Sequence, residues 1–338
     1  MKKASIVMPS DFYNKNRLFD LNDRVSNRDD CLYPYYLLKE KLLEKGYLLA
    51  TSDINDPSES DIVLYNEMPK SFPLKSGMEK SYLLLFESEL IRPDNWDLKK
   101  HRYFKKIFTW NDCYVNNDQY IKFNFPNKVT LRQESGFEKK LCTLIAGNKK
   151  SKHSLELYSK RVNVIRWFEK NHPEDFEFYG MGWDAYQFTG PKYVKILNRI
   201  KPLCKVLAPT YPSYKGKVKS KKDVLELYKF VICFENARDI SGYITEKIFD
   251  CFFAGCVPIY WGANNIAEHI PKNCFIDFTE FKDLNEMYQY ITSMSDSVYQ
   301  SYLASIDEFL KSDDCFKFSA DYFSDMVVNY VLRENDKS

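Results

Sequence analysis

The stretch YKFVICFENARDISGYITEKIFDCFFAGCVPIYWG, residues 228–262, gives the clearest indication of the fold. Its pattern predicts a buried strand at Phe230–Phe234, a helix at Thr245–Phe253 and a second buried strand at Val257–Trp261. Gly255 follows the helix, where a residue without a side chain can end it. Short, wholly apolar strands joined through a helix are typical of a parallel sheet covered on both faces. The stretch therefore predicts an α/β protein.

The same alternation of strands and helices extends over most of the 338 residues. Short apolar runs predict further strands at Ala4–Met8, Tyr47–Ala50, Asp61–Tyr65, Ser81–Phe86, Lys106–Thr109, Leu141–Ala146 and Phe176–Tyr179. Apolar residues at helical spacing predict helices at Tyr33–Lys45, Ser154–Lys170, Lys222–Tyr228, Leu284–Ser293, Tyr299–Leu310 and Phe318–Leu332. No Gly-x-Gly-x-x-Gly loop follows the first strand, which argues against a dinucleotide-dependent dehydrogenase or an epimerase.

The length of the chain suits two α/β domains rather than one. The polar stretch Asn116–Lys140 predicts a linker near Arg132–Lys139. We therefore expect an N-terminal Rossmann-like domain over residues 1–135, a C-terminal one over 140–305, and a helical tail over 306–338 that packs back on the domains. Two such domains facing each other across a cleft fit a transferase that uses a nucleotide-linked sugar.

Composition excludes several other classes of protein. The formal net charge of +2 argues against a nucleic-acid-binding protein. The nine cysteines are odd in number and form no Cys-x-x-Cys, so we expect free, buried thiols in a reducing compartment. The four histidines are not at metal-ligand spacing, which argues against a structural zinc site. The apolar run at residues 4–8 is too short for a signal peptide or a membrane span, so we expect a cytoplasmic protein.

Several polar residues in the 228–262 stretch are suited to bind a diphosphate. Glu235 and Asn236 follow one strand, and Thr245, Glu246 and Lys247 open the helix. Free N–H groups and the helix dipole at such a position favour an anion. Lys247 would add a cation, and Glu246 would accept ribose or sugar hydroxyls or hold the lysine in place. A bare Thr-Glu-Lys also fits an ordinary capped helix with an exposed first turn.

The order and spacing of three motifs resemble the α-1,3/4-fucosyltransferase family, family 10 of the glycosyltransferases. The motifs are Phe234-Glu235-Asn236, Gly242-Tyr243-Ile244-Thr245-Glu246-Lys247 and Val257-Pro258-Ile259-Tyr260-Trp261-Gly262. The resemblance is strongest over residues 215–281 and weaker over 82–148. It implies the two-domain GT-B fold, with the donor bound by the C-terminal domain and the acceptor on the side of the N-terminal domain. It also implies inverting transfer of fucose from GDP-β-L-fucose.

The resemblance also assigns donor-binding residues. Glu246 and Lys247 fall at the family's donor-contacting pair, Asn236 and Tyr243 fall at nearby donor-site positions, and Gly147-Asn148 resembles the family's loop under the diphosphate. With the two flanking residues of the motif, Glu235 and Thr245, they form the expected donor site.

One feature departs from the family pattern. Family members commonly supply an arginine to the diphosphate from a position upstream of the strand at 230–234, yet no arginine lies between Arg199 and Arg238. Lys215 or Lys217 would replace it as a point charge, unless this run is a solvated loop. The sequence has no Asp-x-Asp, so we expect no metal ion and no other cofactor.

An inverting transferase needs a carboxylate to accept the proton of the acceptor hydroxyl. Glu87 follows the strand at residues 81–86, and the resemblance places the catalytic base there. Glu89 would share its face and raise its pKa. Candidates for acceptor binding are Glu89 and, downstream, Arg92, Trp96 and Trp110, although such residues also anchor loops.

The acceptor itself is not determined by the sequence. We expect a surface polysaccharide or lipopolysaccharide glycan, with peripheral contact to the inner face of the membrane if this acceptor is lipid-linked. Two alternatives remain: transfer of another nucleotide-linked deoxysugar on the same fold, and a saccharide-binding protein without catalysis.

Overall fold

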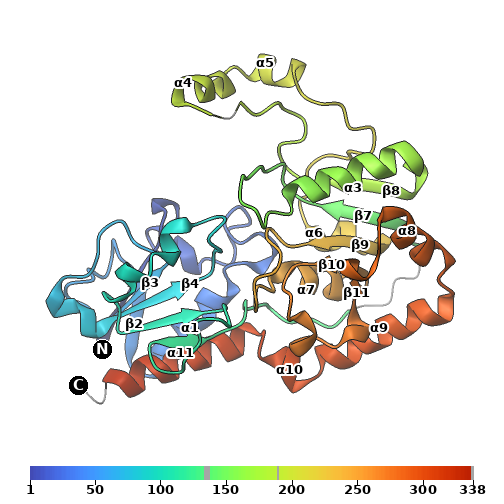
Figure 1. Ribbon diagram of the computed structural model, residues 1–338. Helices are drawn as coiled ribbons and strands as arrows, with labels where there is room; N and C mark the ends of the chain where they lie inside the picture. Colours follow the sequence, from blue (N-terminus) through green and yellow to red (C-terminus); the bar gives the residue numbers. More distant parts are fainter. Residues whose placement is uncertain (133–137, 189, 336–338) are drawn as a thin grey trace.

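The computed structural model describes residues 1–132, 138–188 and 190–335 and contains two parallel sheets, each flanked by helices (Figure 1). Most of the linker predicted near residues 132–139 falls at 133–137 and so lies outside the described residues. One sheet is built from residues before this point and the other from residues after it. Each domain therefore has its own sheet, as the alternation of strands and helices predicts.

The sheet of the N-terminal domain has the strand order β2-β1-β3-β4-β5-β6, and all its pairings are parallel. Its strands are β1 (Lys2–Val7), β2 (Tyr47–Thr51), β3 (Ile62–Asn66), β4 (Ser81–Leu85), β5 (Lys106–Thr109) and β6 (Tyr120–Lys122). Every residue of β3 and β4 is buried. Strands covered on both faces can be continuously apolar, which explains the sequence pattern.

The sheet of the C-terminal domain has the order β11-β10-β9-β7-β8 and is also parallel. Its strands are β7 (Lys140–Ile145), β8 (Phe176–Tyr179), β9 (Tyr228–Phe234), β10 (Val257–Trp261) and β11 (Ile276–Asp277). The central strand β9 is paired with β7 and β10. The motif-rich loops that follow β9 therefore begin near the middle of the sheet, at its carboxyl edge.

The helices lie on both sides of the two sheets. In the order of the chain they are α1 (Tyr33–Glu44), α2 (Leu98–His101), α3 (Tyr158–Asn171), α4 (Lys192–Lys195), α5 (Lys201–Val206), α6 (Lys221–Leu225), α7 (Glu246–Phe253), α8 (Leu284–Ser293), α9 (Asp296–Leu310), α10 (Asp313–Phe316) and α11 (Ala320–Asn335). In Figure 1, α3 covers one face of the C-terminal sheet and α9 the other.

The last helix, α11, returns to the N-terminal domain and packs beside α1 (Figure 1). Val327 and Val331 are buried in the same apolar cluster as Leu38 and Leu42 of α1. Lys41 of α1 also pairs with Asp325 at 2.6 Å. Burial of these side chains ties the end of the chain to the first domain, so α11 holds both domains together.

Several sequence predictions are wrong in detail. The helix predicted from Ser154 begins at Tyr158, and the helix predicted up to Tyr228 ends at Leu225 because Tyr228 opens β9. Strands β6 and β11 and helices α4 and α5 were not predicted, since two to six residues give too short a pattern. All nine cysteines are free, but Cys31 and Cys113 are exposed rather than buried.

The two domains touch closely beside Gly242, which has a φ of +79°. A side chain there would overlap the carbonyl oxygen of Trp110 and come within 2.8 Å of Asp112 Oδ2. Asp112 in turn accepts a hydrogen bond from Asn265 at 2.9 Å and lies 3.0 Å from His269 Nε2. This position therefore needs glycine for two reasons, the backbone conformation and the approach of the other domain.

We predict that Gly242→Ala is much more destabilising than Gly46→Ala. Gly46 also has a positive φ, +84°, but nothing lies within 4 Å of the position of its missing Cβ. Gly46→Ala should lower the free energy of unfolding by about 1 kcal/mol through backbone strain, and Gly242→Ala by about 1–3 kcal/mol more through steric overlap. Urea unfolding of both variants measures this difference, and equal losses would contradict the close domain contact.

Candidate active site

Two cavities adjoin between the domains, at the carboxyl ends of the strands. The cavity on the side of the C-terminal domain has a volume of about 360 Å³, and the one on the side of the N-terminal domain about 750 Å³. We call them the C-domain cavity and the N-domain cavity. Both are lined by Arg28, Phe86, Glu87, Phe125, Lys221, Glu246 and Asp250. A molecule that fills both would therefore pass between Glu87 and Glu246.

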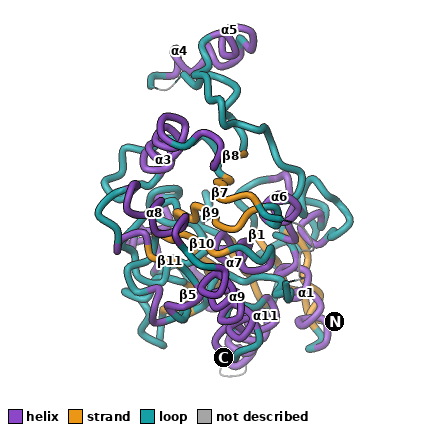
Figure 2. The backbone as a smooth tube through the Cα atoms, turned by 90° about the vertical axis from the view of Figure 1, so that its right-hand side faces the viewer, coloured by secondary structure: helices purple, strands orange, loops and turns teal. Residues whose placement is uncertain are grey.

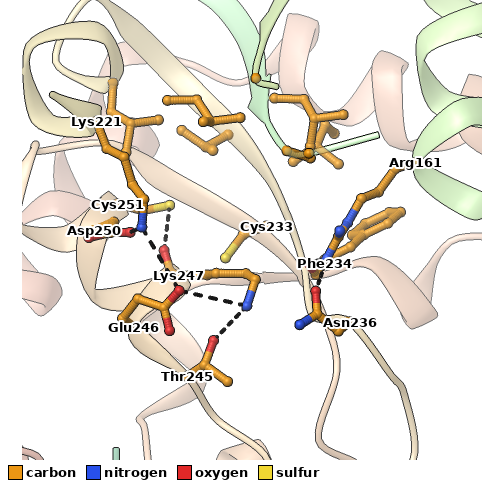
Figure 3. A pocket seen from close by; sticks show the side chains of 18 of the residues that line it. Arg161, Lys221, Cys233, Phe234, Asn236, Thr245, Glu246, Lys247, Asp250 and Cys251 are labelled. Carbon is orange, nitrogen blue, oxygen red and sulfur yellow. Dashed lines mark hydrogen bonds and ion pairs between the residues drawn. The ribbon is translucent and has the colours of Figure 1, made fainter. Parts of the chain in front are cut away.

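A buried carboxylate organises the start of helix α7 in the C-domain cavity. The Glu235 side chain has no exposed surface and accepts hydrogen bonds from the backbone N–H and the hydroxyl of Thr245, both at 2.9 Å. It also pairs with Lys247 at 2.9 Å, and Lys247 donates to the Thr245 hydroxyl at 2.8 Å. The Lys247 ammonium is thus held among fixed oxygen atoms at the start of the helix (Figure 3).

Glu246 is the carboxylate of this helix that remains available to a ligand. Its side chain is half exposed and lies 3.9 Å from Lys247 and 3.8 Å from Lys221. Burial acts to raise the pKa of Glu246, but these two lysines lower it to about 2. Glu235, rather than Glu246, therefore sets the position of Lys247, and Glu246 is an ionised acceptor facing the cavity.

Lys247 and Lys221 both remain charged in this environment. Burial would lower the pKa of Lys247, but Glu235 and Glu246 hold it above the ordinary lysine value. Lys221 pairs with Asp250 at 2.7 Å, and Asp250 and Glu246 raise the pKa of this lysine against the effect of burial. The C-domain cavity therefore presents fixed positive charge.

Besides Arg28 of the N-terminal domain, two further cations of the C-terminal domain line this cavity, and none of the three was predicted. Arg161 comes from α3 and is 5 % exposed; its guanidinium donates to the carbonyl oxygen of Phe234 at 2.6 Å and to Asn236 Oδ1 at 3.2 Å (Figure 3). Lys149 also lines the cavity. It follows β7, which pairs with β9 on the side opposite β10. Arg161 lies 69 residues before Phe230, well upstream of the stretch 200–237 that has no arginine.

The lysines predicted to replace that arginine lie elsewhere. Lys215 is nearly half exposed and sits 3.4 Å from Glu177, and neither Lys215 nor Lys217 lines either cavity. Asn148 is also turned away, because its side chain donates to the carbonyl oxygen of Gly182 at 2.9 Å. Of the predicted donor residues, the structure brings Gly147, Asn236, Tyr243, Thr245, Glu246 and Lys247 into the C-domain cavity.

Glu87 enters the site from the N-terminal domain, directly after β4, and lines both cavities. Burial raises the pKa of Glu87, while Lys149 and Lys247 act in the opposite direction. The sequence predicted that Glu89 would raise this pKa, but Glu89 is exposed and lines neither cavity. The carboxyl group that packs behind Glu87 is instead that of Glu67.

Glu67 follows β3 and is 4 % exposed. Its carboxylate accepts the backbone N–H groups of Phe86 and Glu87, at 3.2 and 3.0 Å, and a hydrogen bond from the Asn95 side chain. Burial raises the pKa of Glu67 to about 7, against the effect of the Asn95 hydrogen bond, and Glu87 adds to the rise. Glu67 therefore fixes the backbone that carries Glu87.

The residues predicted to bind the acceptor support this loop instead. Trp96 donates to the carbonyl oxygen of Glu87 at 3.1 Å, and Arg92 donates to that of Met68 at 2.9 Å. Trp110 is buried, donates to the carbonyl oxygen of Phe86 at 2.8 Å, and packs on Tyr243 with ring centroids 4.7 Å apart. None of the three lines the C-domain or the N-domain cavity, because their polar groups are already bonded within the protein.

Some of the missed residues do have a signal in the sequence. Arg161 falls among the buried residues Tyr158, Ile165 and Phe168 of α3, so it interrupts an apolar stripe with a charge. Glu67 follows a buried strand just as Glu87 does. A charge within an apolar stripe, or directly after a parallel strand, indicates a residue that the fold places at the carboxyl edge of the sheet. In the part of the chain that the structure describes, no cluster of three or more potential metal ligands occurs.

Comparison with known proteins finds similarity to fucosyltransferases over part of the chain. Residues 191–319 match the model described as "Glycosyltransferase family 10 (fucosyltransferase) C-term". The chain is 36 % identical over 97 residues to the α-(1,3)-fucosyltransferase FucT of Helicobacter pylori, and 37 % identical over 79 residues to an α-(1,4)-fucosyltransferase of Arabidopsis thaliana. These matches cover 27 % and 23 % of this chain and a fifth of each relative's length. They support the assignment of the chain to glycosyltransferase family 10.

Solved structures confirm the GT-B fold over nearly the whole chain. A crystal structure of an α1,3-fucosyltransferase with GDP covers 98 % of this chain and 90 % of its own, with a TM-score of 0.55 and 15 % identity. T4 phage BGT in complex with UDP and Mn²⁺ covers 97 % of this chain and 99 % of its own, with a TM-score of 0.54 and 13 % identity. Two Rossmann-like domains facing across a cleft are thus the architecture of this protein.

We predict that Lys149→Ala weakens the binding of GDP, whereas Lys215→Ala does not. Both lysines lie in loops of the C-terminal domain, but only Lys149 lines the C-domain cavity. Loss of one charge-assisted contact to a diphosphate should raise the dissociation constant about tenfold or more. Isothermal titration with GDP measures it, and the reverse order of effects would restore Lys215 as the cation of the site.

We also predict that Glu67 makes the free energy of unfolding depend on pH, and that Glu67→Gln removes this contribution. Between the unfolded pKa of 4.5 and the folded pKa of about 7, the folded protein keeps a proton on Glu67 that the unfolded chain has lost. The free energy of unfolding therefore falls as the pH rises through this window, by at most about 3 kcal/mol from this group. Urea unfolding from pH 4.5 to 7.5 should show a flatter profile in Glu67→Gln than in the wild type.

The exposed Glu44→Gln is the control for this pH experiment, because Glu44 lies on the surface of α1 far from the site in the fold. Its profile should follow that of the wild type. Parallel profiles for all three proteins would show that Glu67 is ionised throughout this pH range.

Proposed function

We propose that this protein is an inverting glycosyltransferase that moves L-fucose from GDP-β-L-fucose to a hydroxyl of a saccharide acceptor, in an α-1,3-type linkage. One observation carries the proposal: a carboxylate of one domain, Glu87, and a cluster of cations of the other line the same cavity. The cations are those of Lys149, Arg161, Lys221 and Lys247. The choice of donor rests on relatives named α-(1,3)- and α-(1,4)-fucosyltransferase and on others named GDP-fucose protein O-fucosyltransferase 3.

In this proposal the acceptor hydroxyl oxygen attacks the anomeric carbon of fucose from the face opposite GDP. The new oxygen–carbon bond forms as the bond to the β-phosphate oxygen breaks, and that oxygen keeps the electron pair. Glu87 takes the proton of the hydroxyl, and burial, which raises its pKa, strengthens it as a base. The attack comes from the N-terminal domain, and the product is the inverted α-glycoside.

The leaving GDP gains negative charge in this step, and the C-domain cavity is suited to stabilise it. Lys247 is held at the start of α7 by Glu235 and Thr245, so it does not need to reorganise during the reaction. Glu246, ionised and half exposed, is placed to accept a ribose or sugar hydroxyl. We propose that the cations of this cavity, Lys149, Arg161, Lys221 and Lys247, neutralise the diphosphate and that transfer needs no metal ion.

The acceptor would occupy the N-domain cavity. Its volume of about 750 Å³ accommodates a short oligosaccharide, and it meets the C-domain cavity at Glu87. Tyr35, Asn66 and Lys128 are among the residues that line it. We propose a glycan of a surface polysaccharide or lipopolysaccharide, with the protein acting in the cytoplasm. Other relatives are named GDP-fucose protein O-fucosyltransferase 3, as in Bos taurus, so a peptide is the second acceptor to test.

We predict that Glu87→Gln lowers the rate of fucose transfer by about 10²- to 10⁴-fold, the usual contribution of a general base. Binding of GDP should be nearly unchanged, because Glu87 belongs to the opposite domain. Glu89→Gln is the matched control: it removes a neighbouring carboxylate that is exposed and lines neither cavity, and its rate should equal that of the wild type.

The measurement combines a transfer assay with thermal unfolding in the presence of GDP, UDP, CDP, dTDP and GDP-fucose, with and without EDTA. A ligand at about 100 times its dissociation constant stabilises the fold by about 2.7 kcal/mol. Stabilisation by GDP and GDP-fucose alone, insensitive to EDTA, supports the donor. A response to dTDP or UDP instead would point to another nucleotide-linked sugar, and binding without any transfer would favour a saccharide-binding protein.

A further inference from the structure

A slender excursion leaves the C-terminal domain between β8 and α6. It carries the short helices α4 and α5, which stand well away from the rest of the molecule in both views (Figures 1 and 2). We call its outer part, residues 190–207, the basic finger. Apart from its base, this finger covers neither sheet, so its sequence is not explained by packing of the core.

The charge of the basic finger has a single sign. Residues 190–207 contain five cations and no acidic residue, and all five are exposed; they are Lys192, Lys195, Arg199, Lys201 and Lys205. Over the longer stretch 185–222 there are ten cations and still no Asp or Glu. The whole chain carries 49 basic and 47 acidic residues, so this concentration is a local property of the excursion.

Large apolar side chains are exposed among these cations. Tyr193 is 73 % exposed and Val206 82 %, and Ile196, Ile200 and Leu207 are each about half exposed. Isolated apolar residues on a surface are common, but five in eighteen residues form a patch that water solvates poorly. The combination of cations with exposed aromatic and aliphatic side chains is typical of segments that lie in the interface of a membrane.

The excursion is nevertheless ordered and firmly attached. The Asn198 side chain exchanges two hydrogen bonds, each of 2.9 Å, with the backbone of Phe188. At the base, the guanidinium of Arg166 lies 3.8 Å from the ring centroid of Tyr211 and donates to the carbonyl oxygen of Thr210 at 2.8 Å. The first pair of bonds closes the excursion on itself, and the Arg166 contacts join its base to α3.

The base of the excursion also belongs to the active site. Gly180 and Met181, where the chain leaves β8, and Val218 and Lys221, where it returns, all line the C-domain cavity. A surface bound by the finger would therefore be held in a fixed relation to the site.

We infer that the basic finger docks the protein on the surface of a bilayer that contains anionic lipids. Its cations would neutralise lipid phosphates, and Tyr193, Ile196 and Val206 would enter the boundary between headgroups and acyl chains. In the described part of the chain, no helix is long and apolar enough to cross a bilayer. Docking would bring the site to a lipid-linked acceptor.

The test is flotation of the whole protein with vesicles of phosphatidylcholine alone and with about 30 % phosphatidylglycerol. The wild type should bind the anionic vesicles, and added salt should weaken this binding. A variant with Lys192→Gln, Lys195→Gln, Arg199→Gln, Lys201→Gln and Lys205→Gln should bind at least about tenfold more weakly. The variant Ile196→Ser with Val206→Ser should also lose affinity, because its apolar contacts are removed while its charge is unchanged.

A matched control changes the same number of charges elsewhere. Lys45, Lys70, Lys75, Lys99 and Lys272 are exposed outside the finger, and their replacement by Gln should leave vesicle binding unchanged. Stabilisation by GDP should be the same in all these proteins, so a failure of the membrane proposal is separate from a failure of the donor proposal.

Three outcomes would overturn the inference. The first is that the wild type does not bind anionic vesicles. The second is that the finger variants and the control variant bind them equally well. The third is that the wild type is an oligomer and that only the finger variants are monomers, which would make the finger a contact between protein chains. Light scattering after gel filtration measures the last of these.

Discussion

The carboxylate of Glu235 is the point on which the C-terminal half of the site depends. It is fully buried at the end of the central strand β9, and it binds the backbone N–H of Thr245, the residue before α7, together with the side chains of Thr245 and Lys247. Its backbone N–H also bonds to the carbonyl oxygen of Trp261, which ties β9 to β10. A buried carboxylate is costly unless it is fully paired, so this network specifies one arrangement of strand, loop and helix.

The N-terminal domain uses the same device. Glu67 is buried at the end of β3 and binds the backbone of Phe86 and Glu87. In each domain one carboxylate is used to hold the structure, and a second, Glu246 or Glu87, is left facing the cavities. The surroundings of these two cavity-facing carboxylates differ: lysines lower the pKa of Glu246, whereas burial raises the pKa of Glu87. Their chemical roles differ because their neighbours differ.

A separate set of contacts holds the two domains together. Trp110, Tyr243 and Phe125 pack together where the domains meet, and Asp112 binds His269 and Asn265 across the boundary. Helix α11 adds a second link by crossing to α1. These contacts fix the distance between Glu87 and the cations of the C-terminal domain. Residues that resemble sugar-binding aromatics in the sequence serve here as the packing of the interface.

The sequence by itself determined the two parallel sheets and the positions of the residues that follow their strands. This was possible because apolar periodicity, glycine stops and residues such as Glu87, Glu235 and Lys247 next to strand or helix ends are local features. It did not determine which polar groups are free to meet a ligand. Only the tertiary structure decided that Lys215 and Trp96 lie outside the cavities and that Arg161 lines one. The physical reason is that a polar side chain is available only if no distant residue already satisfies it, and such pairings, as between Glu67 and Asn95, arise when the chain folds.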